Sequence, residues 1–144
     1  MEVKTYINQN AKKRMGQIQK TSELRDNTYV DAWLKRERPV KCYILMNGNE
    51  VVNIVLITKN DFDPFKLTPK ATKHPRSTTL EYIHTFFAYR QKNFAVDMLK
   101  YLKSKEQTSS FCETDASSLL FKKAGYAYLG KDWLMNELDM YRYP

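Results

Sequence analysis

The chain has 144 residues, a formal net charge of +8, and 42% hydrophobic residues. A chain of this length is typical of one domain and buries roughly 68–70% of its unfolded surface, enough for a hydrophobic core. The composition excludes an intrinsically disordered chain, and no apolar run reaches the ~18 residues of a membrane-spanning helix. The excess of positive charge favours acidic partners such as phosphates, nucleic acid or anionic surfaces.

The first third of the sequence predicts a short strand over residues 3–7, followed by a polar stretch with a basic cluster at 12–14. From 21 to 38 the apolar positions follow a helical period, in one helix or two. Pro39 ends this helical region, because proline cannot continue a helix.

A β-hairpin is the clearest local prediction. The runs 41–46 and 50–58 are rich in β-branched and aromatic residues and are separated by Asn47-Gly48-Asn49. An Asn-Gly turn between two such runs is the strongest short-range signal for a hairpin.

The second half predicts alternating strands and helices after a long loop at residues 59–79. Asn93 and Asp115 are candidate N-cap residues for the two helices, and Gly125 closes the second helix. The expected elements are a strand at 78–88, a helix from 94, a strand at 109–113, a helix at 116–124, and strands at 126–130 and 133–143, the last two forming a hairpin across Gly130-Lys131-Asp132. This order predicts a single α/β (α+β) domain over residues 1–144, with a mixed central sheet of about six to seven strands and about four flanking helices.

The two cysteines, Cys42 and Cys112, are too few for a metal cluster or a disulfide framework, so no metal site is predicted. We interpret them as reduced thiols of a cytoplasmic or otherwise intracellular protein, with a single disulfide as the alternative. The N-terminal stretch lacks the apolar core of a secretory signal, which agrees with this interpretation.

Residues 90–95, Arg-Gln-Lys-Asn-Phe-Ala, connect a predicted strand to a predicted helix. A helix start offers unpaired backbone N–H groups and the positive end of the helix dipole, so such a corner favours phosphate. The segment resembles the acyl-CoA motif Q/R-x-x-G-x-G/A of the GNAT acetyltransferases, with Arg90 and Ala95 in the expected positions and Asn93 in place of a glycine. Residues 120–126 likewise resemble the family pattern L-Y-x-x-x-G-F, with Phe121 in place of the tyrosine.

The order of elements resembles the GNAT fold over nearly the whole chain. The resemblance implies an enzyme that moves an acetyl group from acetyl-CoA to an amine, with the CoA pyrophosphate held by the 89–95 loop. Asparagine is the residue after glycine that best tolerates a positive φ, so the loop is compatible with Asn93. The implied cofactor-binding residues are Phe86, Phe87, Ala88, Arg90, Gln91, Lys92, Asn93, Phe94, Ala95 and Phe121.

Transfer of an acetyl group requires a neutral amine, and a lysine-like amine with a pKa near 10.4 is about 0.1% neutral or less at pH 7. The resemblance implies Glu81, on the strand before the motif, as the base, and His84 is the second catalytic candidate. The structural alternative for Glu81 is a strand-end carboxylate that faces solvent or pairs with a lysine, and the alternative for His84 is a purely structural role. Strand alternation points the two side chains to opposite faces. The family also implies a backbone N–H near residues 85–87 as the donor to the thioester oxygen.

The departures at Asn93 and Phe121 support an alternative function: a non-catalytic GNAT-fold module that binds an acidic protein or nucleic acid. Basic clusters at 12–14, 35–38 and 66–76 suit such a partner, although the sequence has no recognised nucleic-acid motif. The predicted partners of the enzyme are an amine-bearing acceptor, either a small molecule or a protein, and a second copy of the chain in a homodimer. No membrane partner is predicted.

Overall fold

The computed structural model describes residues 1–59, 78–106, 108–112, 114–131 and 138–142. Within these ranges the chain forms seven strands, four α-helices and one 3₁₀ helix, which confirms the mixed α+β class. The chain divides into two compact units, residues 1–58 with 80–95 and residues 59–79 with 96–144. The expectations of one domain and of one central sheet concern both units together and stay predictions.

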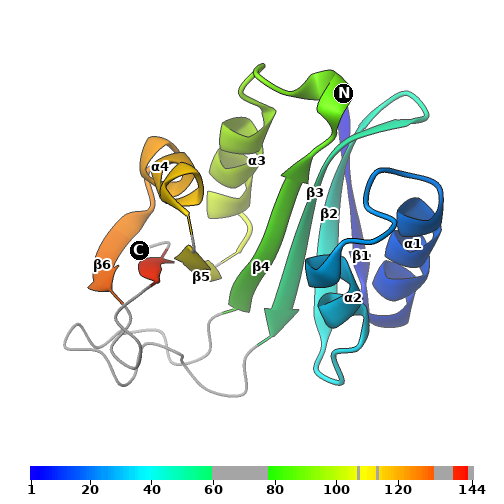
Figure 1. Cartoon of the computed structure of the whole chain (residues 1–144), viewed down its shortest axis with the longest axis horizontal. Coiled ribbons are helices and arrows are strands. Elements are labelled where there is room, and N and C mark those ends of the chain that lie inside the picture. Colours follow the sequence, from blue (N-terminus) through cyan, green and yellow to red (C-terminus); the bar gives the residue numbers. More distant parts are fainter. Residues whose placement is uncertain (60–77, 107, 113, 132–137, 143–144) are drawn as a thin grey trace. The chain divides into compact units, whose positions relative to one another are not determined.

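The first unit contains a sheet with the strand order β1-β2-β3-β4, in which neighbouring strands run antiparallel (Figure 1). Strands β2 and β3 form the predicted hairpin, and Gly48 in its turn has a φ of 60°, a conformation that suits glycine. The elements of this unit are β1 (Glu2–Ile7), α1 (Asn8–Lys20), α2 (Thr28–Leu34), β2 (Val40–Asn47), β3 (Glu50–Lys59), β4 (Thr78–Thr85) and the 3₁₀ helix η1 (Phe87–Tyr89). The first two residues of β4 and the last of β3 are assigned to the second unit.

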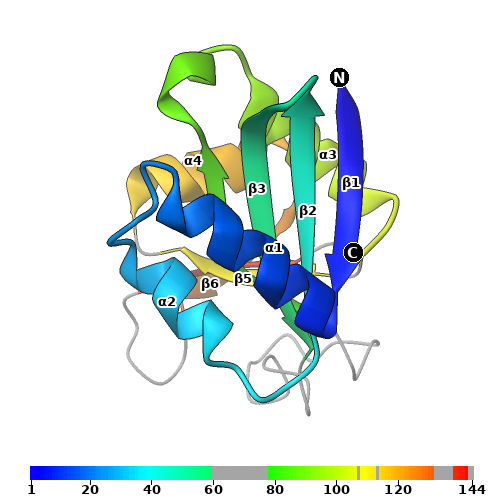
Figure 2. The same cartoon turned by 90° about the vertical axis from the view of Figure 1, so that its right-hand side faces the viewer.

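Helices α1 and α2 cover one face of this sheet (Figure 2). Apolar side chains from both helices and from β2 and β3 form a continuous buried core, whose removal from water is the main source of stability. The indole Nε1 of Trp33 donates a buried hydrogen bond of 3.1 Å to the carbonyl of Ile57 and so ties α2 to β3. The core residues are Ala11, Met15, Ile18, Leu24, Val30, Trp33, Val40, Cys42, Ile44, Met46, Ile54 and Leu56.

Helix α1 occupies the polar stretch for which the sequence analysis expected no helix. Ala11, Met15 and Ile18 are spaced by four and three residues, lie on one face of the helix, and are buried. The rest of the helix is almost entirely polar, so its apolar stripe is only three residues long. The helix forms because tertiary packing of that stripe outweighs the weak local signal.

The expected helical region at 21–38 is helical only over α2. Asn27 begins this helix, since its side-chain oxygen accepts a hydrogen bond of 3.0 Å from the N–H of Val30. Residues 21–26 instead form turns. The cap therefore fixes the start of α2 several residues later than the apolar period suggests.

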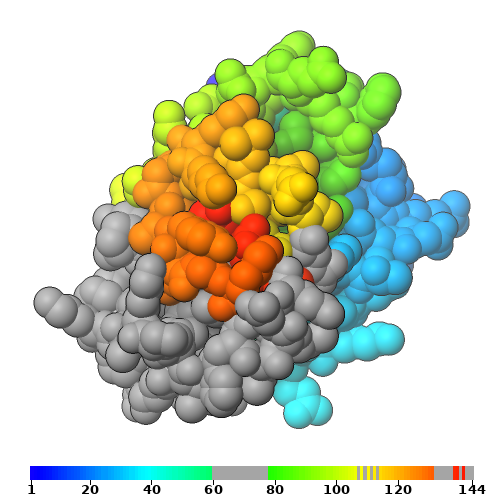
Figure 3. Space-filling view, turned by 60° about the vertical axis from the view of Figure 1, so that its left-hand side comes forward, coloured from blue at the N-terminus to red at the C-terminus, as the bar shows by residue number. Residues whose placement is uncertain are grey.

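The second unit contains strands β5 and β7, which pair antiparallel, and β6, which pairs antiparallel with β7. Thr78 and Thr79 of β4 pair in parallel with Thr108 and Ser109 of β5. Much of α4 and β6 lies on the surface of this unit (Figure 3). The elements are α3 (Phe94–Lys103), which starts in the first unit, β5 (Thr108–Cys112), α4 (Asp115–Lys123), β6 (Ala127–Lys131) and β7 (Asp139–Arg142).

Helix α4 ends as predicted but does not begin at the predicted cap. Gly125 has a φ of 83°, and the N–H of Tyr126 reaches back to the carbonyl of Phe121 at 3.0 Å, which is the geometry of a glycine-terminated helix. At the other end, Thr114 rather than Asp115 accepts the capping hydrogen bond, from the N–H of Ser117 at 3.1 Å.

The antiparallel pairing of the last two strands is confirmed. The turn expected at Gly130-Lys131-Asp132 is wrong in its first two residues, because Gly130 and Lys131 continue β6 and pair with Met140 and Asp139 of β7. Asp132 and most of the loop expected at 59–79 (residues 60–77) lie outside the described residues. None of the helices formed by the described residues has the length and apolar character needed to cross a lipid bilayer.

Candidate active site

The candidate phosphate loop follows β4. The N–H of Phe86 donates to the carbonyl of Val52 at 2.9 Å, and η1 then turns the chain toward the start of α3 at Phe94. In this loop Gln91 has a φ of 64° and Asn93 a φ of 61°. The position at which the motif has glycine therefore takes a backbone conformation that suits glycine and that asparagine tolerates better than most residues.

The loop also carries the donors that a phosphate requires. Residues 90–93 are exposed, and within the described part of the chain no group accepts a hydrogen bond from the backbone N–H groups of 91–93. Residues 94 and 95 stand in the first turn of α3, where N–H groups have no acceptor inside the helix. Successive N–H groups that include left-handed residues form a concave anion-binding nest, so the loop fits a phosphate group.

Arg90 lies at the beginning of this loop. Its Nε donates to the carbonyl of Thr85 at 3.2 Å, its Nη2 lies 3.5 Å from Oε2 of Glu23, and its guanidinium lies 5.6 Å from the centre of the Phe87 ring. The side chain is half exposed. Arg90 is thus fixed by three contacts and still faces solvent.

Glu81, the first catalytic candidate, is held in an ion pair. Nε of Arg36 donates to Oε1 at 3.0 Å and to Oε2 at 3.2 Å, and Nη2 makes a further short contact to Oε1. The hydroxyl of Thr58 donates to Oε2. The pairing with Glu81 raises the pKa of Arg36 above its ordinary value. Both oxygens of the candidate base are therefore engaged in this structure.

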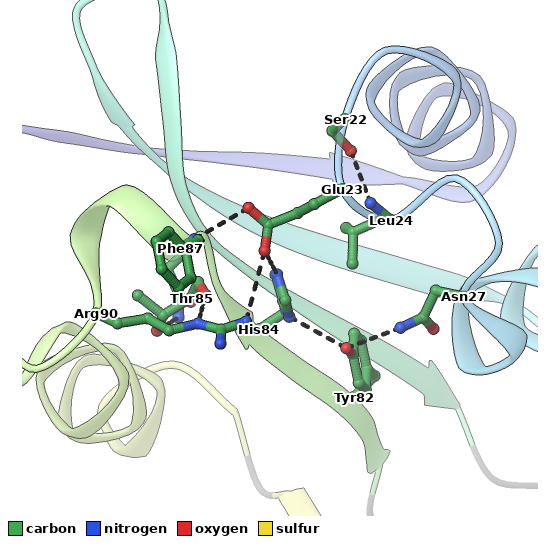
Figure 4. A network of polar contacts seen from close by, with 10 residues as sticks. Ser22, Glu23, Leu24, Asn27, Tyr82, His84, Thr85, Phe87 and Arg90 are labelled. Atoms are coloured by element: carbon green, nitrogen blue, oxygen red, sulfur yellow. Dashed lines mark hydrogen bonds and ion pairs between the residues drawn. The ribbon is translucent and has the colours of Figure 1, made fainter.

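His84, the second candidate, belongs to a chain of hydrogen bonds that runs from helix α2 to Glu23 (Figure 4). Nδ2 of Asn27 donates to the hydroxyl of Tyr82 at 2.9 Å, this hydroxyl lies 3.2 Å from Nδ1 of His84, and Nε2 of His84 lies 2.8 Å from Oε2 of Glu23. The ring of Tyr29 stacks on Tyr82 with centroids 5.3 Å apart. Glu81 and His84 share no partner among these contacts, in agreement with their expected opposite directions.

The groups at the two ends of this series of hydrogen bonds determine which atom donates and which accepts in each bond. The amide oxygen of Asn27 is used by the cap of α2, so its nitrogen must donate to Tyr82. The carboxylate of Glu23 can only accept, so Nε2 of His84 carries a proton. Burial lowers the pKa of His84 and so favours the neutral ring, whereas the bond to Glu23 acts in the opposite direction and is outweighed. Nδ1 then accepts from the Tyr82 hydroxyl, and both ring nitrogens are engaged.

Glu23 is the residue of this site that the sequence analysis missed. Besides His84 it accepts a hydrogen bond of 3.0 Å from the N–H of Phe87. Partial burial acts to raise the pKa of Glu23, but the bonds from Phe87 and His84 and the charge of Arg90 outweigh it, so this pKa is lowered. Glu23 lies in a turn, 61 to 67 positions from its partners, and no sequence spacing could have connected them.

A pocket of about 500 Å³ opens beside this network, entirely within the first unit. Its lining combines apolar side chains with convergent polar groups, as small-molecule sites do. The hydroxyl of Tyr89 donates to Glu50 within this lining. The lining residues are Arg14, Gln17, Ile18, Thr21, Ser22, Glu23, Asn49, Glu50, Val51, Phe86, Ala88 and Tyr89.

The remaining predicted positions have defined environments. The N–H groups of Phe86 and Phe87, near the expected thioester donor, are engaged by Val52 and Glu23. Phe121 is buried in the second unit, where its ring meets Tyr126 edge-on at 5.1 Å and stacks on Tyr141 at 5.6 Å. In the parts of the chain that are described, no group of three or more His, Cys, Asp or Glu could hold a metal ion.

The chain has the GNAT acetyltransferase fold. An acetyltransferase of the GNAT family from Streptococcus agalactiae matches 96% of this chain and 94% of its own, with a TM-score of 0.60 and 13% identity. A Bacillus subtilis acetyltransferase in complex with CoA matches 98% and 96%, with a TM-score of 0.58 and 12% identity. The KacTA–DNA complex matches 99% and 94%, with a TM-score of 0.60 and 8% identity. No protein-family model matches the sequence, and no curated protein shows significant sequence similarity to it.

Proposed function

We propose that the protein is an acetyl-CoA-dependent N-acetyltransferase that acetylates an amine acceptor. The observation that carries this proposal is the φ of 61° at Asn93, in the motif position of the phosphate loop directly before α3, within a GNAT fold. The backbone N–H groups of the loop, with Arg90 and Lys92, would hold the CoA pyrophosphate. The other residues proposed to contact the cofactor are Phe86, Phe87, Ala88, Gln91, Phe94, Ala95 and Phe121.

Bound acetyl-CoA would supply the acetyl group as a thioester, and the chain would bind the acceptor and receive its proton. We place the acceptor amine in the pocket of about 500 Å³. Phe86 and Ala88, two of the proposed cofactor-binding residues, line it, and the carboxylates of Glu23 and Glu50 in the same lining attract a cationic amine.

Glu81 and His84 stay the proposed catalytic residues. For Glu81 to accept a proton, the hydroxyl of Thr58 or the guanidinium of Arg36 must give way. For His84 to accept one at Nδ1, the hydroxyl of Tyr82 must turn away. If neither change occurs, solvent must deprotonate the amine. In that case the rate would rise with pH toward the amine's own pKa, near 10.4 for a lysine-like acceptor.

Isothermal titration calorimetry with acetyl-CoA, and with free CoA for comparison, tests the proposal. We expect micromolar binding that is weakened at least tenfold in Arg90→Ala or Lys92→Ala, because charge-assisted bonds to phosphate are the strongest that the loop can make. Lys13→Ala, on the exposed side of α1, is the matched control for loss of one positive charge. Absence of binding at millimolar acetyl-CoA would exclude the enzyme.

The second candidate function is a non-catalytic binding module with an acidic protein or nucleic-acid partner. Phe121 favours it in two ways: phenylalanine has no hydroxyl that could protonate a leaving thiolate at the position where the family pattern has tyrosine, and its ring is buried against Tyr126 and Tyr141. The charge of +8 and the similarity to a protein that forms a complex with DNA agree with it. Titration of a short DNA duplex at two salt concentrations tests it, since phosphate binding weakens steeply with salt. Salt-dependent DNA binding without acetyl-CoA binding would favour the module.

A further inference from the structure

We infer that Glu23 is a positioning residue for the cofactor loop, which it holds through the Phe87 N–H and the Arg90 guanidinium where β4 passes into the loop. The consequence for the cofactor rests on the proposed function, whereas the positioning itself does not. Figure 4 shows the donors of this corner converging on the single carboxylate of Glu23.

The contacts of Glu23 divide between its two oxygens. Oε1 accepts from the N–H of Phe87 at 3.0 Å, while Oε2 lies 2.8 Å from Nε2 of His84 and 3.5 Å from Nη2 of Arg90. Phe87 is the first residue of η1, and Arg90 is the first residue of the acyl-CoA motif. One side chain from the turn between α1 and α2 thus contacts both ends of the 87–90 segment.

The backbone that carries Glu23 is itself fixed. The next residue, Leu24, is buried in the core of the first unit, and its N–H donates to Oγ of Ser22 at 3.2 Å. The N–H of Asn27 donates to the carbonyl of Leu24 at 3.1 Å. Glu23 therefore presents its carboxylate from a rigid support, which is what a residue that orients another group requires.

Nε2–H of His84 is the third donor to Glu23, and it fixes the direction of the carboxylate. Since Asn27 donates to Tyr82 and Tyr82 donates to His84, the imidazole can offer only an N–H toward Glu23. A carboxylate accepts from this N–H, from Phe87 and from Arg90 at once, whereas a glutamine has one fewer accepting oxygen. The requirement is therefore for a glutamate, not merely for a polar side chain.

Removal of Glu23 would leave the Phe87 N–H without its acceptor and Arg90 with one fewer partner. The start of the loop would then sample more conformations, and a ligand would have to order it on binding. We expect the cofactor affinity to fall even though Glu23 has the same sign of charge as phosphate.

The experiment compares the wild type with Glu23→Gln, Glu23→Ala, Arg90→Ala and the double variant Glu23→Ala/Arg90→Ala. Glu37→Gln is the matched control, because Glu37 is an exposed carboxylate of the same unit without a hydrogen bond or ion pair to any described residue. Three quantities are measured: amide exchange at Phe87, the ¹⁵N shifts of the His84 ring, and acetyl-CoA affinity by calorimetry.

In Glu23→Ala we expect exchange at Phe87 to accelerate about tenfold or more, and acetyl-CoA to bind about tenfold more weakly. Glu23→Gln should lie between wild type and Glu23→Ala, and the ¹⁵N shift of Nε2 of His84 should change in both, because its N–H loses the bond to the carboxylate while Tyr82 keeps the proton at Nε2. The double variant should bind more weakly than Arg90→Ala by less than the loss that Glu23→Ala causes alone, because Glu23 acts partly through Arg90 and partly through Phe87.

Unchanged exchange at Phe87 in Glu23→Ala would overturn the inference. Tighter binding of acetyl-CoA by that variant would also overturn it, because Glu23 would then compete with phosphate for Arg90. If the wild type does not bind acetyl-CoA, the proposed function fails, and exchange at Phe87 with the His84 shifts still decides the positioning role. Should Glu23→Ala not fold, Glu23→Gln supplies the same readouts.

Discussion

Asn93 adopts a left-handed backbone conformation that is unfavourable for most residues. For an ordinary L-residue this conformation costs roughly 1–2 kcal/mol, and asparagine pays less because its short polar side chain can bond locally. The substitution of the motif glycine by asparagine therefore preserves the backbone of the loop while adding a side chain next to the proposed phosphate position.

We expect Asn93→Ala to lower the free energy of unfolding by about 1 kcal/mol, because alanine lacks this local compensation. Asn93→Gly should leave stability within about 0.5 kcal/mol, since relief of strain is offset by a more flexible unfolded chain. Urea unfolding measures both. Equal stability of the two variants would show that the positive φ is not maintained in solution.

His84 makes the folded state sensitive to mild acid. Burial lowers its pKa below the ordinary value of 6.5, with the bond to Glu23 acting in the opposite direction. As pH falls below 6.5, the unfolded chain takes up a proton that the folded chain accepts only at lower pH. Stability from this group is therefore complete above pH 6.5 and is lost progressively as pH falls toward the folded pKa.

We expect the urea midpoint to decrease between pH 7.5 and pH 5.5 in the wild type, and to decrease less in His84→Gln. The chain contains one other histidine, His74, so His74→Gln is the control and should retain the wild-type slope. The lowered pKa of Glu23 acts in the same direction but only at lower pH, since its ordinary value is 4.5. If the urea midpoint of His84→Gln decreases with pH as steeply as that of the wild type, His84 is not the source of the acid sensitivity.

At the scale of single elements, α4 shows how neighbouring residues divide the two roles of a helix start. The hydroxyl of Thr114 accepts the capping hydrogen bond, whereas Asp115 lies in the first turn, where a negative charge only complements the helix dipole. Asp115 is the candidate cap that the sequence offers, and aspartate has the stronger preference for the position. The extended backbone of Thr114, with φ −123° and ψ 155°, places its side chain at the free N–H groups.

We therefore expect Thr114→Ala to lower stability by about 1 kcal/mol and Asp115→Ala by roughly 0.3–1 kcal/mol. Only the effect of Asp115→Ala should shrink in 1 M salt, because screening weakens the interaction of a charge with the dipole. Thermal or urea unfolding at two salt concentrations distinguishes the two roles. A larger loss in Asp115→Ala would restore it as the cap.

At the scale of the whole molecule, the two cysteines report on the two units separately. Cys42 lies in the core of the first unit and Cys112 in the second, and both are buried and free. Burial raises the pKa of each thiol to about 12, so neither reacts readily with thiol reagents in the folded protein. Labelling of each thiol therefore requires its own unit to open.

Thiol labelling across a urea series tests whether the chain is one domain. In the single-thiol variants Cys42→Ala and Cys112→Ala we expect the remaining thiol to become reactive at the midpoint at which that variant loses its far-ultraviolet circular dichroism. Exposure of one thiol well before the loss of that signal would mean that the two units unfold independently.

The sequence by itself determined the elements whose signals are local. The Asn-Gly turn predicted the β2–β3 hairpin, Gly125 predicted the end of α4, and the motif at 90–95 predicted the strand–loop–helix corner. These features depend on the φ preferences of single residues and on short apolar periods, which a one-dimensional pattern contains.

Only the tertiary structure decided which charged groups meet. Arg36 engages Glu81 from 45 positions away, and Glu23 engages Phe87 and Arg90 from 64 and 67 positions away. Helix α1, similarly, depends on a core that receives its three apolar residues. Such contacts form where the folded chain brings segments that are distant in sequence together, and local propensity does not indicate which segments these are.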